Sequence, residues 1–294
     1  MTVNEFLQKL LKSQALTKQM LDDLSSHRAE VEEVLREKFG TEPTIRYGGS
    51  KAKGTMVQES YDLDVVCYFP RDCDRDIDEI YKDVQKKLSE KYSVTPKNSA
   101  LRIQKLDTDN ATLDYHIDVV PGRFIDDKKQ DTFLYVSHGD VKRIKTNLDT
   151  HIKVISQSGC LDIIRVGKLW RARNSINLRT FLLELLIIKC LESYNAKDNL
   201  QSSFKKFLEY LRDSISDVRL EDPANTNNVV SDNWSDGERQ IISSKAEEAL
   251  NIVNSDSDDP DKWREIFREP KSDKYLGETS VVITKNRLSK PWCV

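Results

Sequence analysis

Apolar residues recur every three or four positions through the first forty residues, which is the spacing of one face of a helix. They fall into two runs on either side of Thr17, and Gly40 and Pro43 close the second run. The apolar positions are Phe6, Leu10 and Leu11 in the first run and Leu21, Leu24, Val31, Val34 and Leu35 in the second. The pattern predicts an N-terminal helical region, which we expect to brace both halves of the chain.

Shorter apolar segments bounded by turn residues follow, and these predict strands. The expected strands are Thr44–Tyr47, Leu63–Phe69, Leu101–Leu106, Leu113–Val120 and Phe133–Val136. A helical pattern from Ile77 to Tyr92 lies between the second and third strands. The segment Asp107–Ala111 is rich in Asp and Asn and predicts a hairpin between the third and fourth strands.

From about residue 147 the pattern becomes helical. The expected helices lie in "DIIRVGKLWRARN", "RTFLLELLIIKCLESY", "FKKFLEYLRDSI" and "ERQIISSKAEEALNIV". The second of these is apolar nearly all round, which is typical of a helix buried among other helices. The segment "EDPANTNNVVSDNWSDG" predicts a loop, and the tail from Pro270 is expected to be weakly ordered. The fold class is therefore α+β, with a mixed half over residues 1–146 and a helical half over residues 147–294.

Composition limits the class of protein. The chain has 294 residues, of which 38% are hydrophobic and 32% charged, as expected of a soluble globular protein. No apolar run has the length of a membrane span, no signal-peptide pattern is present, and the five cysteines show no metal spacing, so we expect a cytoplasmic protein. The net charge of −3 gives no overall attraction to nucleic acid, so the sequence shows no strong sign of a nucleic-acid activator.

Three aspartates lie in otherwise apolar strands. Asp62 and Asp64 are two residues apart, so a strand directs both to one face, and Asp118 in "YHIDVVPG" joins them if the two strands are neighbours. Neighbouring carboxylates repel each other, and neither predicted strand holds a lysine or arginine to neutralise them. Either their pKa values rise or divalent cations fill the site, and hard oxygen ligands in an open cleft favour Mg²⁺.

A turn suited to phosphate precedes the first two aspartates. Gly48 and Gly49 permit close backbone approach, and Ser50 is expected to cap a short helix whose N-terminus would attract an anion. Phosphates held there would extend toward Asp62 and Asp64. This combination is typical of nucleotidyl transfer, in which two metal ions about 3.5–4 Å apart activate a hydroxyl and stabilise the leaving pyrophosphate.

These motifs together resemble the polymerase-β-type nucleotidyltransferases. The closest resemblance is to the branch of oligoadenylate synthases, cyclic GMP-AMP synthase and the bacterial cyclic-oligonucleotide synthases (CD-NTases) of CBASS anti-phage defence. That branch commonly reads GGSxxKGT before its Asp pair, and Lys53 fits the motif. "VGKLWR" and "TFLLELL" resemble the two helices of that branch that touch the donor triphosphate. The contacting residues here would be Lys168 in the first segment and Thr180 in the second, where the family usually has serine. "DPANTNNV" resembles a loop of the oligoadenylate synthases, with Thr226 in place of a proline.

The resemblance implies a bilobed polymerase-β-like fold, with a mixed sheet and flanking helices in the catalytic lobe, a helical C-terminal lobe and the active site between them. It implies that Asp62 and Asp64 bind two Mg²⁺ ions, for which Mn²⁺ can substitute, and that Asp118 binds the catalytic ion and helps to deprotonate the acceptor hydroxyl. Gly49, Ser50, Lys53, Lys168 and Thr180 would contact the donor nucleotide. The substrates would be nucleoside triphosphates such as ATP, the product a cyclic di- or trinucleotide or a short oligonucleotide, and the partner an effector protein that binds this product.

Two other functions remain open from the sequence. One is an RNA-tailing enzyme resembling the CCA-adding transferases, although such enzymes usually carry extra RNA-binding domains. The other is a nucleotide-binding scaffold without catalysis, which the three intact aspartates disfavour.

Several single residues are weaker candidates. Arg123 suits a nucleotide phosphate or a solvated loop equally, and His116 shares a strand with Asp118. For Tyr194 and Trp234, packing is favoured over stacking on a base.

Overall fold

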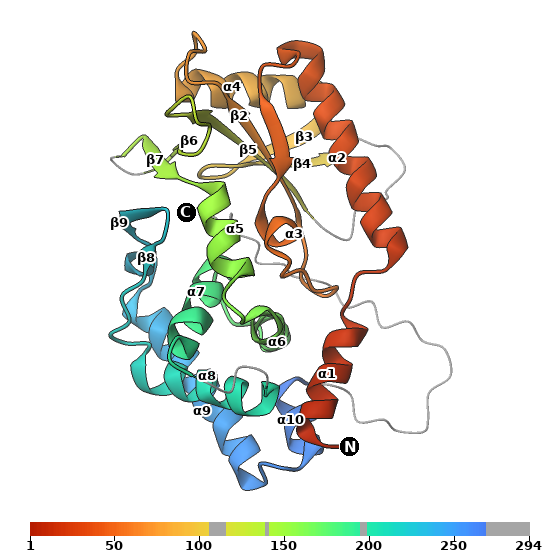
Figure 1. Cartoon of the computed structure of the whole chain (residues 1–294), viewed down its shortest axis with the longest axis vertical. Coiled ribbons are helices and arrows are strands. Elements are labelled where there is room, and N and C mark those ends of the chain that lie inside the picture. The colour runs from red at the N-terminus through yellow and green to blue at the C-terminus, as the bar shows by residue number, and fades with distance from the viewer. Residues whose placement is uncertain (106–115, 139–140, 195–198, 269–294) are drawn as a thin grey trace.

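The computed structural model describes residues 1–105, 116–138, 141–194 and 199–268. Within these residues a mixed sheet with its covering helices lies beside a bundle of helices (Figure 1). The sheet consists of β1 (Thr44–Tyr47), β2 (Leu63–Phe69), β3 (Tyr92–Pro96), β4 (Leu101–Lys105), β5 (Ile117–Phe124), β6 (Thr132–Tyr135) and β7 (Arg143–Thr146). Its order is β1-β2-β5-β4-β3, and β6 pairs with both β5 and β7. The β2–β5 pair is parallel and the others are antiparallel. The predicted α+β class is thereby confirmed.

The alternation of side chains along β2 sorts them onto two faces of the sheet. Leu63, Val65 and Cys67 pack with the helices α2 (Lys18–Phe39) and α4 (Ile77–Leu88). Asp64 and Val66 alternate with them and therefore lie on the opposite face. The aspartates thus belong to the face that α2 and α4 leave uncovered.

The helical bundle begins at residue 148 and contains a second core. Its helices are α5 (Leu148–Ser156), α6 (Leu161–Arg173), α7 (Thr180–Leu191), α8 (Leu200–Ser214), α9 (Asp236–Ser255) and α10 (Pro260–Ile266). As predicted from its apolar character, α7 is buried along most of its length. None of the described helices combines the length and the apolar character that a membrane span requires.

The N-terminal region divides between the two cores. It forms two helices, α1 (Val3–Ser13) and α2, each capped at its start by the hydroxyl of a threonine, Thr2 or Thr17. The buried face of α1 packs into the helical core, whereas α2 packs on the sheet. The expected bracing of both halves is therefore achieved by two separate helices, and the proposed division at residue 146 stays a prediction.

Several predicted boundaries were wrong. The helix expected to reach Tyr92 ends at Leu88, because Tyr92–Pro96 forms a strand that pairs with β4. Such pairing with a distant strand outweighs local periodicity. The expected loop near residue 221 contains a small hairpin, β8 (Glu221–Asp222) and β9 (Asn225–Val229), followed by a short 3₁₀ helix, η1 (Val230–Asn233).

The structure confirms that β4 and β5 are antiparallel neighbours. The segment expected to join them, 107–111, and the weakly ordered tail from Pro270 lie outside the described residues.

We expect Phe6→Ala to lower the free energy of unfolding by about 3–5 kcal/mol, because it deletes a buried aromatic ring and leaves a cavity. Phe6 packs edge-on against Phe267, with ring centroids 6.4 Å apart. Urea denaturation can be followed by the fluorescence of Trp170 and Trp263, which lie in the same core. The matched control is Lys9→Ala on the exposed side of α1, and equal effects of the two substitutions would contradict the packing described for this helix.

Candidate active site

A row of charged side chains crosses the middle of the sheet. The parallel register places Asp64 of β2 directly opposite Asp118 of β5, and the antiparallel register places Arg102 of β4 opposite Asp118. Residues directly opposite in paired strands share one face of a sheet. The structure therefore brings Asp64 and Asp118 together as predicted, and it adds a cation that the sequence analysis missed.

Arg102 neutralises Asp118 in this structure. Its Nε and Nη2 atoms donate to Oδ1 and Oδ2 of Asp118, both at 2.8 Å. The two side chains are buried, with relative exposures of 9% and 2%. Although burial lowers the pKa of Arg102, its hydrogen bonds to Asp118 raise that pKa above the usual value. The sequence analysis considered only the strands that carry the aspartates, whereas this countercharge comes from the neighbouring strand β4.

Asp64 is in a different electrostatic position. Burial raises its pKa well above the usual value, and the charges of Asp118 and Asp62 raise it further. Lys53 and Lys168 oppose this shift to a smaller extent. Burial and the neighbouring carboxylates therefore disfavour the charged form of Asp64.

Asp62 lies just before β2 rather than within it, which corrects the expectation that both aspartates belong to one strand. Its Oδ1 accepts a hydrogen bond from the backbone N–H of His116, at 3.2 Å. His116 therefore contributes to the site through its backbone. This bond ties the residue before β2 to the residue before β5.

The donor chemistry of the three aspartates fits a divalent cation. All are hard oxygen ligands, and Asp64 carries the raised pKa of a buried carboxylate among like charges. However, no group of three His, Cys, Asp or Glu residues within the described ranges is arranged to hold a metal ion. Arg102 already binds both oxygens of Asp118.

The glycine turn lies directly against Asp64. It leads into α3 (Gly49–Lys53), and the backbone N–H of Gly48 donates to the carbonyl oxygen of Asp64 at 2.8 Å. Gly49 has φ +49°, and a Cβ atom at this position would lie 1.7 Å from Oδ2 of Asp64. Only glycine permits this approach. The N-cap of α3 is Gly48 and not Ser50, so the predicted capping role of Ser50 was wrong.

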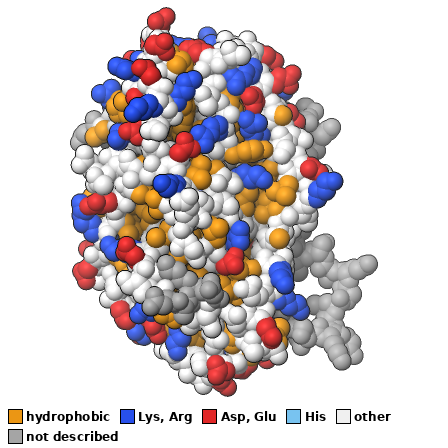
Figure 2. Space-filling view, viewed as in Figure 1, with side chains coloured by type: hydrophobic (Ala, Val, Ile, Leu, Met, Phe, Trp, Pro, Cys, Tyr) orange, Lys and Arg blue, Asp and Glu red, His pale blue; other side chains and the backbone are white. Residues whose placement is uncertain are grey.

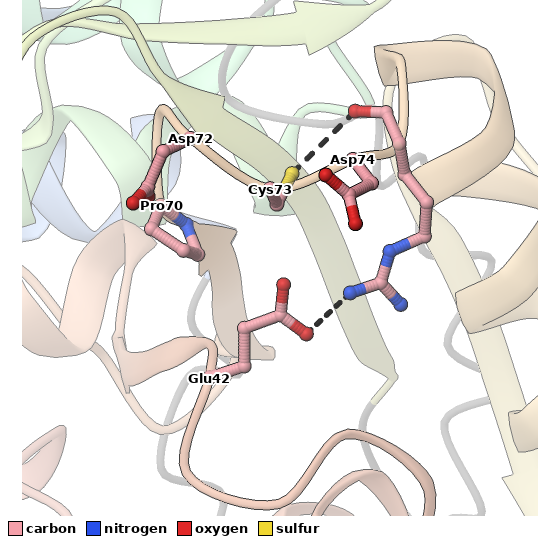
Figure 3. Close-up of a pocket in the computed structure, with 6 residues that line it drawn as sticks. Glu42, Pro70, Asp72, Cys73 and Asp74 are labelled. Carbon is pink, nitrogen blue, oxygen red and sulfur yellow. Dashed lines mark hydrogen bonds and ion pairs between the residues drawn. The ribbon is translucent and has the colours of Figure 1, made fainter.

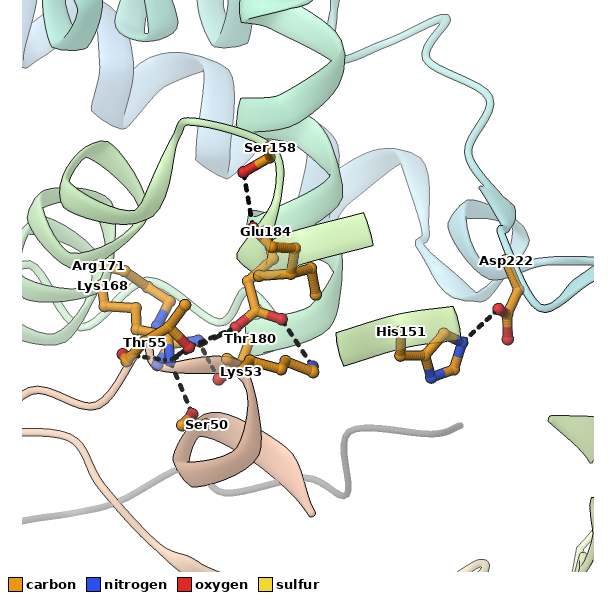
Figure 4. A network of polar contacts seen from close by, with 11 residues as sticks. Ser50, Lys53, Thr55, His151, Ser158, Lys168, Arg171, Thr180, Glu184 and Asp222 are labelled. Atoms are coloured by element: carbon orange, nitrogen blue, oxygen red, sulfur yellow. Dashed lines mark hydrogen bonds and ion pairs between the residues drawn. The ribbon is translucent and has the colours of Figure 1, made fainter. Parts of the chain in front are cut away.

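Ser50 instead contacts the helical bundle through Lys168 of α6. Lys168 Nζ donates to Oγ of Ser50 at 2.8 Å, and to the carbonyl oxygen and Oγ1 of Thr55, both at 2.9 Å (Figure 4). The ammonium is buried, and burial lowers the pKa of Lys168 to about 8, against an opposing effect of Glu184. The structure thus places Lys168 beside the glycine turn, and its predicted contact with the donor triphosphate stays a prediction.

Glu184 of α7 is the buried anion that joins these groups. It accepts from Lys53 Nζ and from Thr55 Oγ1, both at 2.8 Å. Although burial raises the pKa of Glu184, the charges of Lys53 and Lys168 lower it overall. Lys53 is only 1% exposed, so its ammonium lies inside the contact between the turn and the helices. Its predicted contact with a nucleotide stays a prediction.

Thr180 begins α7 and is held by an arginine that the sequence analysis did not single out. Arg171 Nη1 donates to Oγ1 of Thr180 at 2.9 Å, and Nη2 donates to Oγ of Ser60 at 3.2 Å. Arg165, Lys168 and Arg171 are spaced three residues apart on α6, and all three donate to the segment between residues 50 and 60. The spacing of these three cations, at i, i+3 and i+6 along one helix, was the sequence feature from which Arg171 could have been identified as a candidate.

The other weaker candidates, Arg123, Tyr194 and Trp234, make contacts away from the aspartates. Arg123 donates to the carbonyl oxygens of Arg71 and Arg75, and so fastens the loop after β2. Trp234 is buried in the helical core, and Tyr194 packs against the same core, which confirms the favoured interpretation.

A separate cavity of about 510 Å³ lies at the loop after β2 (Figure 3). Its lining residues are Glu42, Pro70, Asp72, Cys73, Asp74 and Arg75. The guanidinium of Arg75 is bound to Glu42, and the residues that line the cavity do not include Asp62, Asp64 or Asp118. Acidic and basic side chains are interspersed over the face of the molecule in Figure 2. The row formed by Asp64, Asp118 and Arg102 on the sheet is therefore the candidate site.

Known structures share this fold. The chain superposes on Escherichia coli MS115-1 CdnC with ATP at a TM-score of 0.70 and 19% identity, covering 90% of this chain and 98% of that chain. For the Bradyrhizobium diazoefficiens CD-NTase CdnG in complex with GTP, the TM-score is 0.73 at 12% identity, with coverages of 90% and 95%. For the Vibrio cholerae DncV cyclic AMP-GMP synthase in complex with nonhydrolyzable GTP, it is 0.63 at 20% identity, with coverages of 90% and 84%.

A search of curated proteins by sequence found no match. The family comparison is decisive, because residues 1–158 match the Second Messenger Oligonucleotide or Dinucleotide Synthetase (SMODS) domain. The matched region is more than half of the chain and contains the glycine turn and all three aspartates. This protein belongs to the SMODS family of second-messenger nucleotide synthetases.

Proposed function

We propose that this protein joins nucleoside triphosphates into a cyclic di- or trinucleotide, or a short oligonucleotide, that acts as a second messenger. The observation that carries the proposal is the position of the Gly49–Ser50 turn directly against Asp64, which itself lies opposite Asp118. A turn able to approach phosphate thus adjoins two carboxylates on one face of the sheet. Membership of the SMODS family favours a second messenger over an RNA-tailing reaction.

The donor nucleotide would lie between the turn and the helical bundle. Lys168 reaches Ser50 and Thr55 from α6, and Arg171 holds Thr180 at the start of α7. These donors converge from both parts of the molecule, so a triphosphate would find cations on one side and backbone N–H groups on the other. The complexes of CdnC with ATP and of CdnG with GTP support nucleoside triphosphates as substrates.

Asp62, Asp64 and Asp118 would hold divalent metal, which we propose to be two Mg²⁺ ions that Mn²⁺ can replace. Bound metal would supply Lewis-acid stabilisation of the phosphate charges. A 2′- or 3′-hydroxyl oxygen of one nucleotide forms a bond to the α-phosphorus of the other. The bond from that phosphorus to the β-phosphate breaks, and pyrophosphate leaves. Asp118 is the carboxylate that we assign to help remove the hydroxyl proton.

The contact between turn and helices would keep this geometry. Lys53, Thr55 and Glu184 form a buried network that fastens α3 to α7, next to the proposed phosphate site. We further propose that the protein acts in the cytoplasm in anti-phage signalling and that an effector protein binds its product.

We expect the purified protein, given Mg²⁺ or Mn²⁺ and the four labelled triphosphates, to form a small product that resists phosphatase. The double variant Asp62→Ala, Asp64→Ala should lose this product because it lacks two of the three proposed metal ligands. The matched control removes the exposed carboxylates of Asp72 and Asp74 instead, and should retain activity. Thin-layer chromatography before and after phosphatase treatment measures the result. Equal product from wild type and the Asp62/Asp64 variant would contradict catalysis at this site, and extension of added tRNA would favour RNA tailing.

We expect Gly49→Ala to reduce product formation by about a hundredfold or more, because the added methyl group must displace the carboxylate of Asp64. Gly54→Ala is the matched control. Gly54 also has a positive φ, +74°, but a Cβ atom there would meet nothing within 4 Å. This control should lose about 1–2 kcal/mol of stability and keep most of its activity. Initial rates and melting temperatures of the two variants separate the effects, and similar activity losses would show that backbone strain alone is responsible.

We expect kcat/KM for the triphosphate to fall as the pH rises above about 8. Burial lowers the pKa of Lys168 to about 8, so in the free enzyme the ammonium is charged below that pH and loses its proton above it. The neutral amine no longer attracts phosphate, and kcat/KM reports the protonation state of the free enzyme. In Lys168→Arg the charge persists, so this decline should disappear. Identical pH profiles of wild type and variant would assign the decline to another group.

A further inference from the structure

The ion pair between Arg102 and Asp118 is built into the sheet. The two residues are direct partners in the register of β4 and β5, and the guanidinium binds both carboxylate oxygens at 2.8 Å. Both side chains are buried, and Asp118 is only 2% exposed. The pair is therefore fixed by backbone hydrogen bonding and shielded from solvent, in contrast to a surface ion pair.

The same carboxylate oxygens have a second proposed use. If Asp118 binds metal, at least one of them must coordinate a cation while a guanidinium lies within hydrogen-bonding distance. Two cations on one buried carboxylate repel each other strongly, because little solvent screens their charges. Asp118 thus has two alternative cationic partners, the guanidinium of Arg102 and a bound metal ion, while Asp64 on its other side only adds repulsion.

We propose that Arg102 is a positioning residue that holds Asp118 in the ligand-free enzyme and must release at least one of its oxygens before Asp118 can bind metal. This inference rests on the proposed function. An arriving nucleotide offers the guanidinium an alternative partner, because arginine binds phosphate with the same two-pronged geometry as carboxylate. Metal and nucleotide would then promote each other's binding, and Asp118 would stay neutralised until both are present.

The direct test is Mn²⁺ binding to the full-length protein without nucleotide, measured by electron paramagnetic resonance of the free ion. Arg102→Gln should bind Mn²⁺ roughly tenfold to a hundredfold more tightly than wild type, which corresponds to the loss of a charge-assisted hydrogen-bonded pair. Arg102→Lys keeps the charge without the two-pronged geometry and should give an intermediate affinity. Adding a nonhydrolysable triphosphate should reduce the difference in Mn²⁺ affinity between wild type and Arg102→Gln.

The matched control is Arg46→Gln, which removes one positive charge from the exposed pair of Arg46 with Asp149. It should bind Mn²⁺ as wild type does, so that a general effect of net charge can be recognised. Melting temperatures supply a second readout. Mn²⁺ should raise the melting temperature of Arg102→Lys more than it raises the melting temperature of wild type. This comparison remains informative if Arg102→Gln does not fold.

Equal Mn²⁺ affinity in wild type and both Arg102 variants would overturn the inference and leave the proposed function intact. Weaker binding in the variants would also overturn it, because Arg102 would then be orienting Asp118 for metal. If wild type, Arg102→Gln and Arg102→Lys all fail to bind Mn²⁺, with or without the triphosphate, the proposed metal role of the aspartates fails. This inference then fails with it.

Discussion

The parallel pairing of β2 with β5 is the constraint on which the candidate site depends. It places Asp64 directly opposite Asp118 on the face of the sheet that α2 and α4 do not cover. Two like charges at this depth are unfavourable, since burial and mutual repulsion both raise the pKa of Asp64. A shift of one residue in this register would move Asp118 to the face that packs against α2 and α4, among apolar side chains. The register therefore creates both the site and its electrostatic cost.

Other groups of the molecule surround these two buried carboxylates. Arg102 compensates Asp118 from β4, while Asp64 is approached closely by the backbone at Gly49. On the other side of the turn, Lys53 and Glu184 form a buried ion pair between α3 and α7. Replacing such a pair with apolar residues is often neutral or stabilising in other proteins, so its presence is weak evidence of a role in stability. Its position beside the glycine turn favours a role in fixing the geometry between the two parts of the chain.

Much of this could be predicted from local patterns. The helical periodicity of the N-terminal region, the apolar character of α7 and the short apolar segment at β2 all led to elements that the structure contains. Where local patterns misled, distant pairing was the reason: Tyr92 continues a helical periodicity but joins a strand because β4 offers it a partner. Serine is a common helix-capping residue, yet Gly48 occupies the cap position of α3. The hydroxyl of Ser50 instead accepts a hydrogen bond from Lys168.

The sequence by itself determined which groups the candidate site contains, because it places a glycine turn directly before two aspartates and supplies a third aspartate in an apolar segment. Only the tertiary structure decided how their charges are balanced. Arg102 is distant in the chain from Asp64 and Asp62, and Glu184 lies 131 residues from Lys53, with which it shares a hydrogen bond. Such partners depend on strand register and on the packing of helices against the sheet. These are set by the summed burial of many apolar side chains, and no short stretch of sequence contains them.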